Sequence, residues 1–181
     1  MENKQQPPQQ QQQPPTTEMV ESSIACDALR TMASERHGDR AGAIVMQLWS
    51  DTDDARFLLM RTRGRDGTAA AAAYASYRMI GREDDASEES TTCFVSDLYV
   101  RPAFRRRGLA RRILRRLTQP QDEGSCETAA WSKVQLHVMR DNEPAVQLYR
   151  SEGFKELSPA DADAAWTDRG KHLMEFTCAR A

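Results

Sequence analysis

The segment from Val95 to Leu117, VSDLYVRPAFRRRGLARRILRRL, limits the folds open to this chain more than any other stretch. Its first residues alternate between apolar and polar side chains, which is typical of a half-buried strand. Its second half carries apolar residues at helical spacing, namely Leu109, Ile113, Leu114 and Leu117. The sequence therefore predicts a strand that runs directly into a helix.

The turn between that strand and helix has the composition of a phosphate-binding site. Its residues are Arg105, Arg106, Arg107, Gly108, Leu109 and Ala110. A glycine lets the backbone approach a ligand, and the first turn of a helix has N–H groups without intrahelical partners. The arginines add positive charge and fork-shaped donors, so we expect a diphosphate to bind here. The arginines further along, at 111, 112, 115 and 116, lie off the apolar stripe and could equally form a solvated helix face.

Two ordered motifs resemble the GNAT superfamily of N-acetyltransferases. The first is Arg-x-x-Gly-x-Ala (residues 105–110) after a strand that ends in Leu-Tyr-Val-Arg-Pro (residues 98–102), which is similar to the family's acetyl-CoA-binding motif. The second, LHVMRDNEPAVQLYRSEGF (residues 136–154), resembles the strand and helix that follow in the same family. The resemblance covers residues 92–154, about a third of the chain.

This resemblance implies a fold and a cofactor. The fold is α/β (α+β), a mixed, mainly antiparallel central sheet with helices on both faces, splayed between two central strands to admit the pantetheine arm of acetyl-CoA. Acetyl-CoA is the implied co-substrate, and no metal is implied. The implied cofactor contacts are main-chain N–H groups near Leu98, Tyr99 and Val100, the turn from Arg105 to Ala110, and Asn142. Asn142 could equally be only a helix cap.

Acetyl transfer to an amine needs a neutral amine, a polarised carbonyl and a protonated leaving thiolate. Tyr149 stands at the family's tyrosine position, which makes it the candidate acid; the alternative is a packing role. The base stays open between two residues. His137 lies in a Leu-His-Val sequence that resembles N-alpha-acetyltransferase subunits, and Asp97 resembles the carboxylate of histone-tail enzymes of the NatD type.

The acceptor is less constrained than the cofactor. We expect a protein amine, either an N-terminal alpha-amine or a lysine, attacked directly in a ternary complex; small-molecule amines remain open. A different class, a non-catalytic CoA-binding module in a complex or homodimer, is the alternative.

The balance of 25 basic and 27 acidic residues argues against nucleic-acid binding. No apolar run is long enough for a membrane span, so a cytoplasmic or nuclear protein is expected.

The remaining sequence predicts one domain, residues 18–181, behind a disordered tail, residues 1–17, that holds seven glutamines and four prolines. We expect helix within 22–50 with a stop at Gly38, and the next helix to begin near Asn142. Strands are expected at 56–61, 69–80, 133–139 and 172–178, with loops at 64–67, 81–90, 118–131 and 158–170. Five successive alanines from Ala69 favour helix by propensity, but the family order favours a strand. The four cysteines are expected to be reduced and mostly buried.

Overall fold

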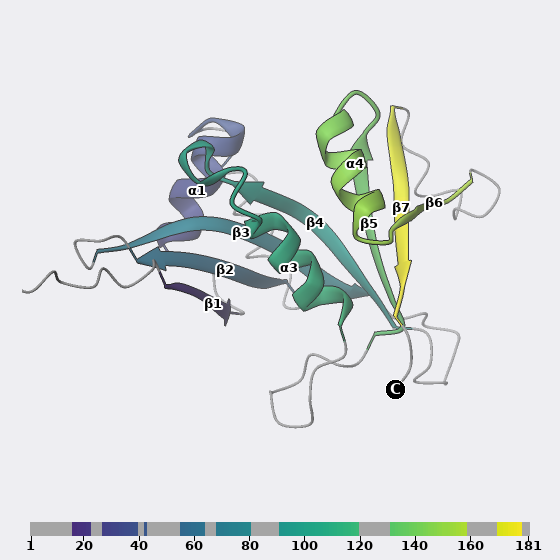
Figure 1. Ribbon diagram of the computed structural model, residues 1–181, viewed down its shortest axis with the longest axis horizontal. Coiled ribbons are helices and arrows are strands. Elements are labelled where there is room, and N and C mark those ends of the chain that lie inside the picture. Colours follow the sequence, from purple (N-terminus) through teal and green to yellow (C-terminus); the bar gives the residue numbers. More distant parts are fainter. Residues whose placement is uncertain are drawn as a thin grey trace, which may run out of the picture.

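The computed structural model of the chain describes residues 16–22, 27–39, 42, 55–63, 68–80, 91–119, 131–158 and 170–178. Within these ranges one sheet has seven strands in the order β1-β2-β3-β4-β5-β7-β6 (Figure 1). The strands are β1 (Thr17–Ser22), β2 (Arg56–Arg63), β3 (Ala69–Ile80), β4 (Thr92–Val100), β5 (Lys133–Met139), β6 (Lys155–Glu156) and β7 (Lys171–Thr177). The helices are α1 (Asp27–His37), α3 (Leu109–Thr118), α4 (Glu143–Ser151) and the short 3-10 helix η2 (Pro102–Phe104).

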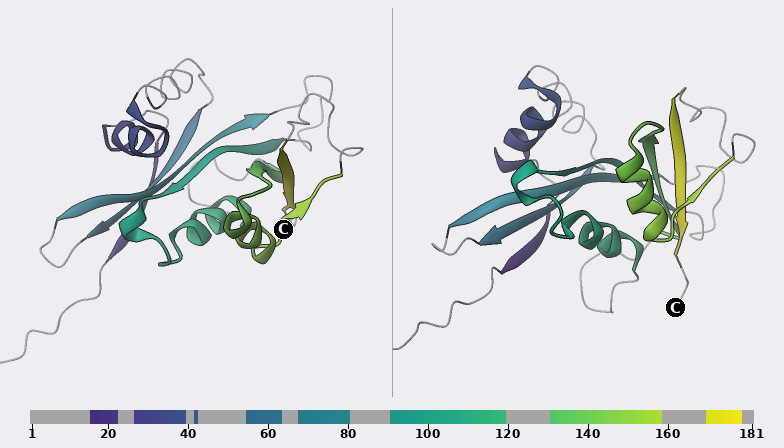
Figure 2. Two further views of the ribbon diagram at one scale, coloured as in Figure 1. Left: turned by 90° about the horizontal axis from the view of Figure 1, so that it is seen from above. Right: turned by 45° about the horizontal axis from the view of Figure 1, so that its top comes forward.

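The sheet is mixed and mainly antiparallel, as the sequence predicts. β4 and β5 run parallel, and the other neighbouring strands pair antiparallel. Figure 2 shows α1 on one face of the sheet and α3 and α4 on the other. The predicted fold class, with helices on both faces, is therefore confirmed.

β4 and β5 pair only at their beginnings. The parallel register joins Thr92–Val95 to Lys133–Leu136 and stops there, and the two strands separate beyond that point (Figure 1). Ser96 is an extra residue on β4, because Ser76 pairs with Asp97 and Tyr77 with Val95. Such a bulge bends a strand and increases its twist, which turns β4 away from β5. The predicted splay between two central strands is confirmed.

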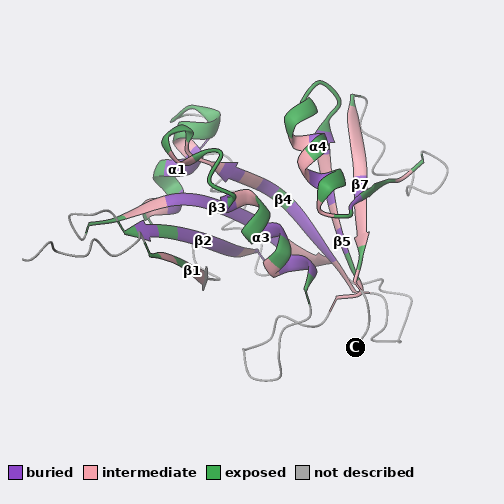
Figure 3. Cartoon of the chain, in the orientation of Figure 1, coloured by how far each residue is buried: buried purple, intermediate pink, exposed green. Residues whose placement is uncertain are grey.

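Buried residues, coloured purple in Figure 3, lie along the central strands and on the helices. Their apolar side chains form two clusters, one on each side of the sheet. The larger cluster lies under α3 and α4, and the four apolar residues predicted for α3 are all buried in it. Burying one leucine-sized side chain contributes roughly 1.5–3 kcal/mol, so this stripe holds α3 on the sheet. The smaller cluster lies under α1 and includes Leu29, Met32, Tyr74 and Tyr99.

The alanine run forms a strand, as the family order suggested. β3 begins at Ala69, and Ala72, Ala73 and Ala75 are fully buried in the cluster beneath α3. Hydrogen-bonded pairing with β2 and β4 stabilises the strand, although alanine has a low strand propensity. Small side chains at these positions also let a helix approach the sheet closely.

The start of the chain departs slightly from prediction. Thr17 belongs to the edge strand β1, and the N–H of Arg63 donates to the carbonyl of Thr16 at 3.0 Å, so the last two residues of the predicted tail join the sheet. Residues 1–15 lie outside the described residues. The predicted helix is present as α1, which ends at His37. The next residue, Gly38, has a φ of 81° and stops the helix there, as predicted.

The predicted loops at 64–67 and 81–90, most of those at 118–131 and 158–170, and two of the four cysteines lie outside the described residues. Cys93 is buried and Cys178 half-buried, both as free thiols. Burial raises the pKa of the Cys178 thiol. Among the described helices, none has the length and apolar character to cross a membrane.

Candidate active site

The turn between β4 and α3 is open to a ligand. Gly108 caps α3 in the left-handed region, with φ 75° and ψ 9°, and as a glycine it brings no side chain to the N-terminal N–H groups of the helix. A Cβ at Gly108 would meet no atom within 4 Å, so the glycine serves the backbone conformation and leaves the approach clear. Arg106 also has positive φ, at 62°. This geometry suits the predicted role of residues 105–110 in binding phosphate.

The arginines around this turn have different tasks. Arg105 Nε donates to the carbonyl of Val100 at 3.1 Å, and the Arg107 guanidinium lies 5.3 Å from the centre of the Phe104 ring. Arg111 and Arg115 both pair with the buried carboxylate of Glu152, at 2.5 and 2.9 Å, and so join α3 to the end of α4. These two are therefore structural, a role that neither of the alternatives drawn from the sequence included.

The second half of β4 has one free edge. Leu98, Tyr99 and Val100 pair with β3, but beyond Val95 no strand among the described residues pairs with the other edge. Side chains alternate, so Leu98 and Val100 contact the cluster under α3 while Tyr99 lies in the cluster under α1. The main-chain donors predicted to hold the thioester thus lie on a strand with an open edge; the contact itself stays a prediction.

Tyr149 lies on α4, buried beside the ring of Phe154 at 5.8 Å between centres. Burial, the largest cause, raises the pKa of Tyr149 to about 12, while the positive charge of Arg36 opposes this and the negative charge of Asp97 adds to it. The phenol is therefore protonated at neutral pH, as a proton donor must be. Tyr149 belongs to the apolar cluster under α3 and α4, whereas Asp97 accepts a hydrogen bond from Tyr74 of the cluster under α1.

Asp97 is at the centre of a hydrogen-bonded group that we call the Asp97 cluster, made of Arg36, His37, Tyr74 and Asp97. Arg36 Nε lies 2.7 Å from Asp97 Oδ1, while the Tyr74 hydroxyl donates to Oδ2 at 2.6 Å. His37 Nε2 lies 3.0 Å from the same Oδ2. Burial and the charge of Asp97 raise the pKa of Tyr74 far above its ordinary value, so its phenol acts as a donor. Both carboxylate oxygens therefore already accept hydrogen bonds.

The end of α1 is fastened to the sheet by three consecutive residues. Glu35 accepts from Arg101 at 2.5 and 2.7 Å, and Arg101 Nη1 also donates to the carbonyl of Ala71 at 3.0 Å. The Arg36 guanidinium lies 5.6 Å from the centre of the Tyr99 ring. Sequence reasoning missed Arg36 and His37, because no pattern connects the end of α1 with a strand 60 residues later.

His137 lies on β5, one residue past the last pair with β4. Its neighbours Leu136 and Val138 are buried under α3 and α4, so its ring points to the opposite face of the sheet. There it meets the edge of the Phe94 ring, with centres 5.4 Å apart. The residue is half-buried where β4 and β5 begin to separate, and its role as base stays a prediction.

Asn142 caps α4. Its side-chain oxygen accepts from the N–H of Ala145 at 3.4 Å, and Pro144 follows in the first turn. The structural alternative drawn from the sequence is thus confirmed, while a contact with the cofactor stays a prediction.

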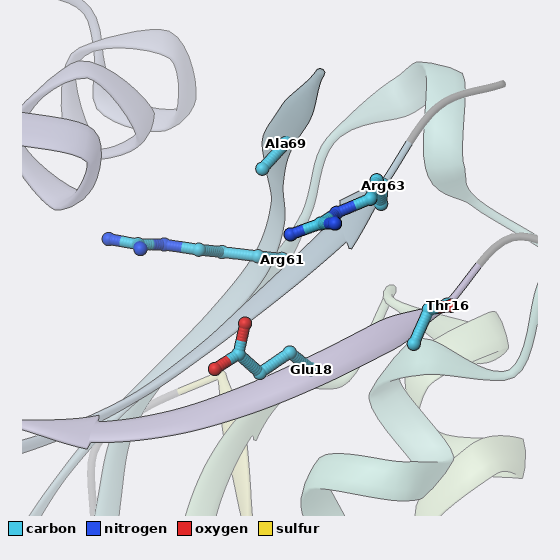
Figure 4. A pocket seen from close by; sticks show the side chains of 5 residues that line it. All are labelled: Thr16, Glu18, Arg61, Arg63 and Ala69. Atoms are coloured by element: carbon cyan, nitrogen blue, oxygen red, sulfur yellow. The ribbon is translucent and has the colours of Figure 1, made fainter. Parts of the chain in front are cut away.

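A separate hollow of about 230 Å³ is lined by Thr16, Glu18, Arg61, Arg63 and Ala69 (Figure 4). Its walls come from β1, β2 and the beginning of β3, so it does not belong to the splay between β4 and β5. Across the described part of the chain, no three His, Cys, Asp or Glu side chains gather as metal ligands.

The fold and this arrangement define a class of protein. A strand with a free edge, a turn open to phosphate and a protonated tyrosine across the splay are the parts that an acyltransferase needs to hold an acyl-CoA and protonate its thiolate.

Comparison with known proteins agrees with this class. The profile of the Acetyltransferase (GNAT) family matches residues 23–154, and the chain belongs to this family. It is 26% identical over 83 residues to the thialysine N-epsilon-acetyltransferase of Sus scrofa, a match over 46% of each chain, so it aligns with about half the length of that relative.

Solved structures share the fold. Arabidopsis thaliana NAA60 in complex with acetyl-CoA superposes with a TM-score of 0.63 at 18% identity, over 90% of this chain and 98% of that one. A GNAT-family acetyltransferase from Bacillus cereus gives 0.58 at 15% identity, over 91% and 99%. Campylobacter jejuni PseH in complex with acetyl coenzyme A gives 0.56 at 10% identity, over 91% and 100%. The resemblance stated from the two sequence motifs is confirmed.

Proposed function

We propose that this protein transfers the acetyl group of acetyl-CoA to a primary amine by direct attack in a ternary complex. The observation that carries the proposal is the buried, protonated phenol of Tyr149 opposite the free edge of β4. The amine nitrogen attacks the thioester carbonyl, the carbon–sulfur bond breaks, and the sulfur takes a proton from Tyr149. Membership of the acetyltransferase family supports the same reaction.

The chain's own groups have defined tasks in this reaction. The N–H groups of Gly108 to Ala110 would hold the diphosphate, and the side chains of Arg106 and Arg107, both exposed, would add positive charge. The free edge of β4 from Leu98 to Val100 would bind the pantetheine arm and the thioester carbonyl through main-chain donors. Positioning the two reactants together supplies a large part of the rate.

Our first candidate for the acceptor is a protein amine, either an N-terminal alpha-amine or a lysine. The sequence Leu136-His137-Val138 supports it, since it resembles protein N-alpha-acetyltransferase subunits. The second candidate is a small amine, because the porcine relative is named for acetylating thialysine. Both present a primary amine to the same thioester.

The test is release of the CoA thiol from the full-length protein with acetyl-CoA and three kinds of acceptor. These are peptides with a free N-terminus and no lysine, N-terminally blocked peptides with one lysine, and small amines that include thialysine. Faster thiol release with one kind of acceptor identifies that kind as the substrate class. The release should be abolished in Tyr149→Phe and kept in Tyr77→Phe. Tyr77 is a matched control, because it is also buried but packs against Trp131. Binding of acetyl-CoA without release for any acceptor would identify a non-catalytic CoA-binding module instead.

A further inference from the structure

The Asp97 cluster contains a histidine that no sequence motif includes. His37 is the last residue of α1, and its Nε2 lies 3.0 Å from Asp97 Oδ2. The side chain of His37 is 29% exposed, whereas that of Asp97 is 7% exposed. A solvent-accessible imidazole is therefore backed by a buried carboxylate.

The hydrogen bonds of this group determine which nitrogen of His37 is available. Arg36 and Tyr74 donate to Asp97, so the carboxylate acts as an acceptor. A neutral imidazole that bonds to it through Nε2 must carry its hydrogen there. The lone pair of Nδ1 then remains for another partner, and a carboxylate that fixes the tautomer in this way prepares a histidine to accept a proton.

The position of the pair fits a role in acetyl transfer. Asp97 is two residues past the last β4–β5 pair, on the part of β4 whose outer edge is free. Its negative charge and the positive charge of Arg36 both act on the phenol of Tyr149 from across the splay. The candidate acid on α4 and the His37–Asp97 pair therefore lie on two sides of one opening.

We propose that His37 takes the proton from the acceptor amine and that Asp97 acts through it as a positioning residue. This inference rests on the proposed acetyl transfer. As the amine nitrogen bonds to the carbonyl carbon, its proton passes to His37 Nδ1, and the departing sulfur takes a proton from Tyr149. His37 returns its proton to solvent, Tyr149 regains one from solvent, and the net products are an amide and CoA thiol.

The charged and titratable groups that contact His37 or its partner Asp97 come from three of the described elements. They are Arg36 on α1, Tyr74 on β3 and Asp97 on β4. Tyr99 on β4 lies beneath the Arg36 guanidinium, and the charges of Arg36 and Asp97 act on Tyr149 on α4. Glu35 is paired with Arg101.

The experiment uses the full-length chain with the best acceptor of the panel. Initial rates of CoA thiol release are measured from roughly pH 5.5 to 9 for the wild type and for His37→Gln, with His137→Gln as the matched histidine control. Affinity for acetyl-CoA is measured by calorimetry for each protein. We expect His37→Gln to lower kcat about a hundredfold or more and to remove one acidic limb of the pH profile, while the limb set by deprotonation of the amine itself remains and the affinity for acetyl-CoA is unchanged.

Chemical rescue separates chemistry from folding. Added imidazole should restore part of the activity of His37→Ala and none to His137→Ala. Asp97→Asn should lower kcat and leave the affinity for acetyl-CoA unchanged, because the carboxylate that fixes the tautomer of His37 is lost. Full activity with an unchanged profile in His37→Gln, or removal of the limb by His137→Gln instead, would overturn the inference. A wild type that binds acetyl-CoA and acetylates nothing would overturn the proposed function itself, and this inference with it.

Discussion

The cofactor side of the site and the Asp97 cluster are assembled differently. The cofactor side is nearly continuous in sequence, since the free edge of β4, the turn at Gly108 and the first turn of α3 all fall within residues 96–112. The Asp97 cluster joins α1, β3 and β4 across 60 residues of sequence. A site built from one segment is visible as a motif, whereas a site built from three depends on packing. The predictions below test whether the two sides also differ in what they contribute.

The largest effect should come from Tyr149, the candidate acid on α4. Tyr149→Phe keeps the ring against Phe154 but removes the proton donor, so kcat should fall about a hundredfold to ten-thousandfold. The KM for acetyl-CoA should change little, because the phenol acts in the transition state. Steady-state kinetics measure this split. If kcat is unchanged and single-turnover measurements show no slowing of the chemical step, Tyr149 is only a packing residue.

Gly108→Glu should damage the cofactor side alone. The substitution strains a left-handed residue and places a negative charge where phosphates are expected, so affinity for CoA should fall at least about tenfold, equivalent to roughly 1.4 kcal/mol. Gly170→Glu is the matched control, because Gly170 also has positive φ and open space for a Cβ but lies just before β7, which begins at Lys171. Equal calorimetric affinities of the two variants would contradict the phosphate-binding role of the turn.

Asp97→Asn should destabilise the protein more than Glu152→Gln does. Asp97 is buried and holds Arg36, His37 and Tyr74, so losing its charge weakens three contacts, for a cost of about 1–3 kcal/mol in the free energy of unfolding. The partners of Glu152 are 47% and 57% exposed, which lowers the worth of those ion pairs. Denaturant titration gives both values. The reverse order would mean that the Asp97 cluster does not hold α1 to the sheet.

The last prediction concerns alkaline pH. The pKa of Tyr149 in the folded protein, about 12, is above that of a tyrosine in the unfolded chain. The contribution of Tyr149 to the free energy of unfolding is therefore complete below the unfolded-state pKa and is lost as pH rises through the folded-state pKa. Stability should fall by about 1.4 kcal/mol for each pH unit between roughly 10 and 12 on account of Tyr149. Tyr149→Phe should make the decline shallower when unfolding is followed across this range. Tyr74→Phe should also make the decline in stability at alkaline pH shallower, because the pKa of Tyr74 is raised as well.

The sequence predicted those parts of the molecule that depend on local order. The strand and helix around Gly108, the strand at Ala69–Ile80 and the cap at Asn142 are present where they were expected. The alanine strand needed the family order as a guide, because propensity alone favoured helix. β1 begins at Thr17, inside the predicted tail, since an edge strand needs only pairing with β2 and carries little periodic signal.

The site could be predicted only in part. Tyr149 and Asp97 follow from motifs, but the partners of Asp97 do not, because Arg36 and His37 belong to a helix whose sequence shows only a buried stripe and a stop at Gly38. The pairing of Arg111 and Arg115 with Glu152 was equally hidden, since it depends on how α3 and α4 lie on the sheet. Contacts between elements are tertiary facts, and one sequence alone does not encode them as a pattern.

Direct transfer is the central claim, and isotopically labelled acetyl-CoA tests it most directly. The full-length protein is incubated with the labelled donor, with and without the preferred amine, and both protein and amine are examined by mass spectrometry. The account predicts one labelled acetyl group on the amine for each CoA thiol released, and neither thiol release nor labelled protein when the amine is absent. A labelled cysteine or a burst of thiol without amine would show an acetyl-enzyme intermediate and contradict direct attack.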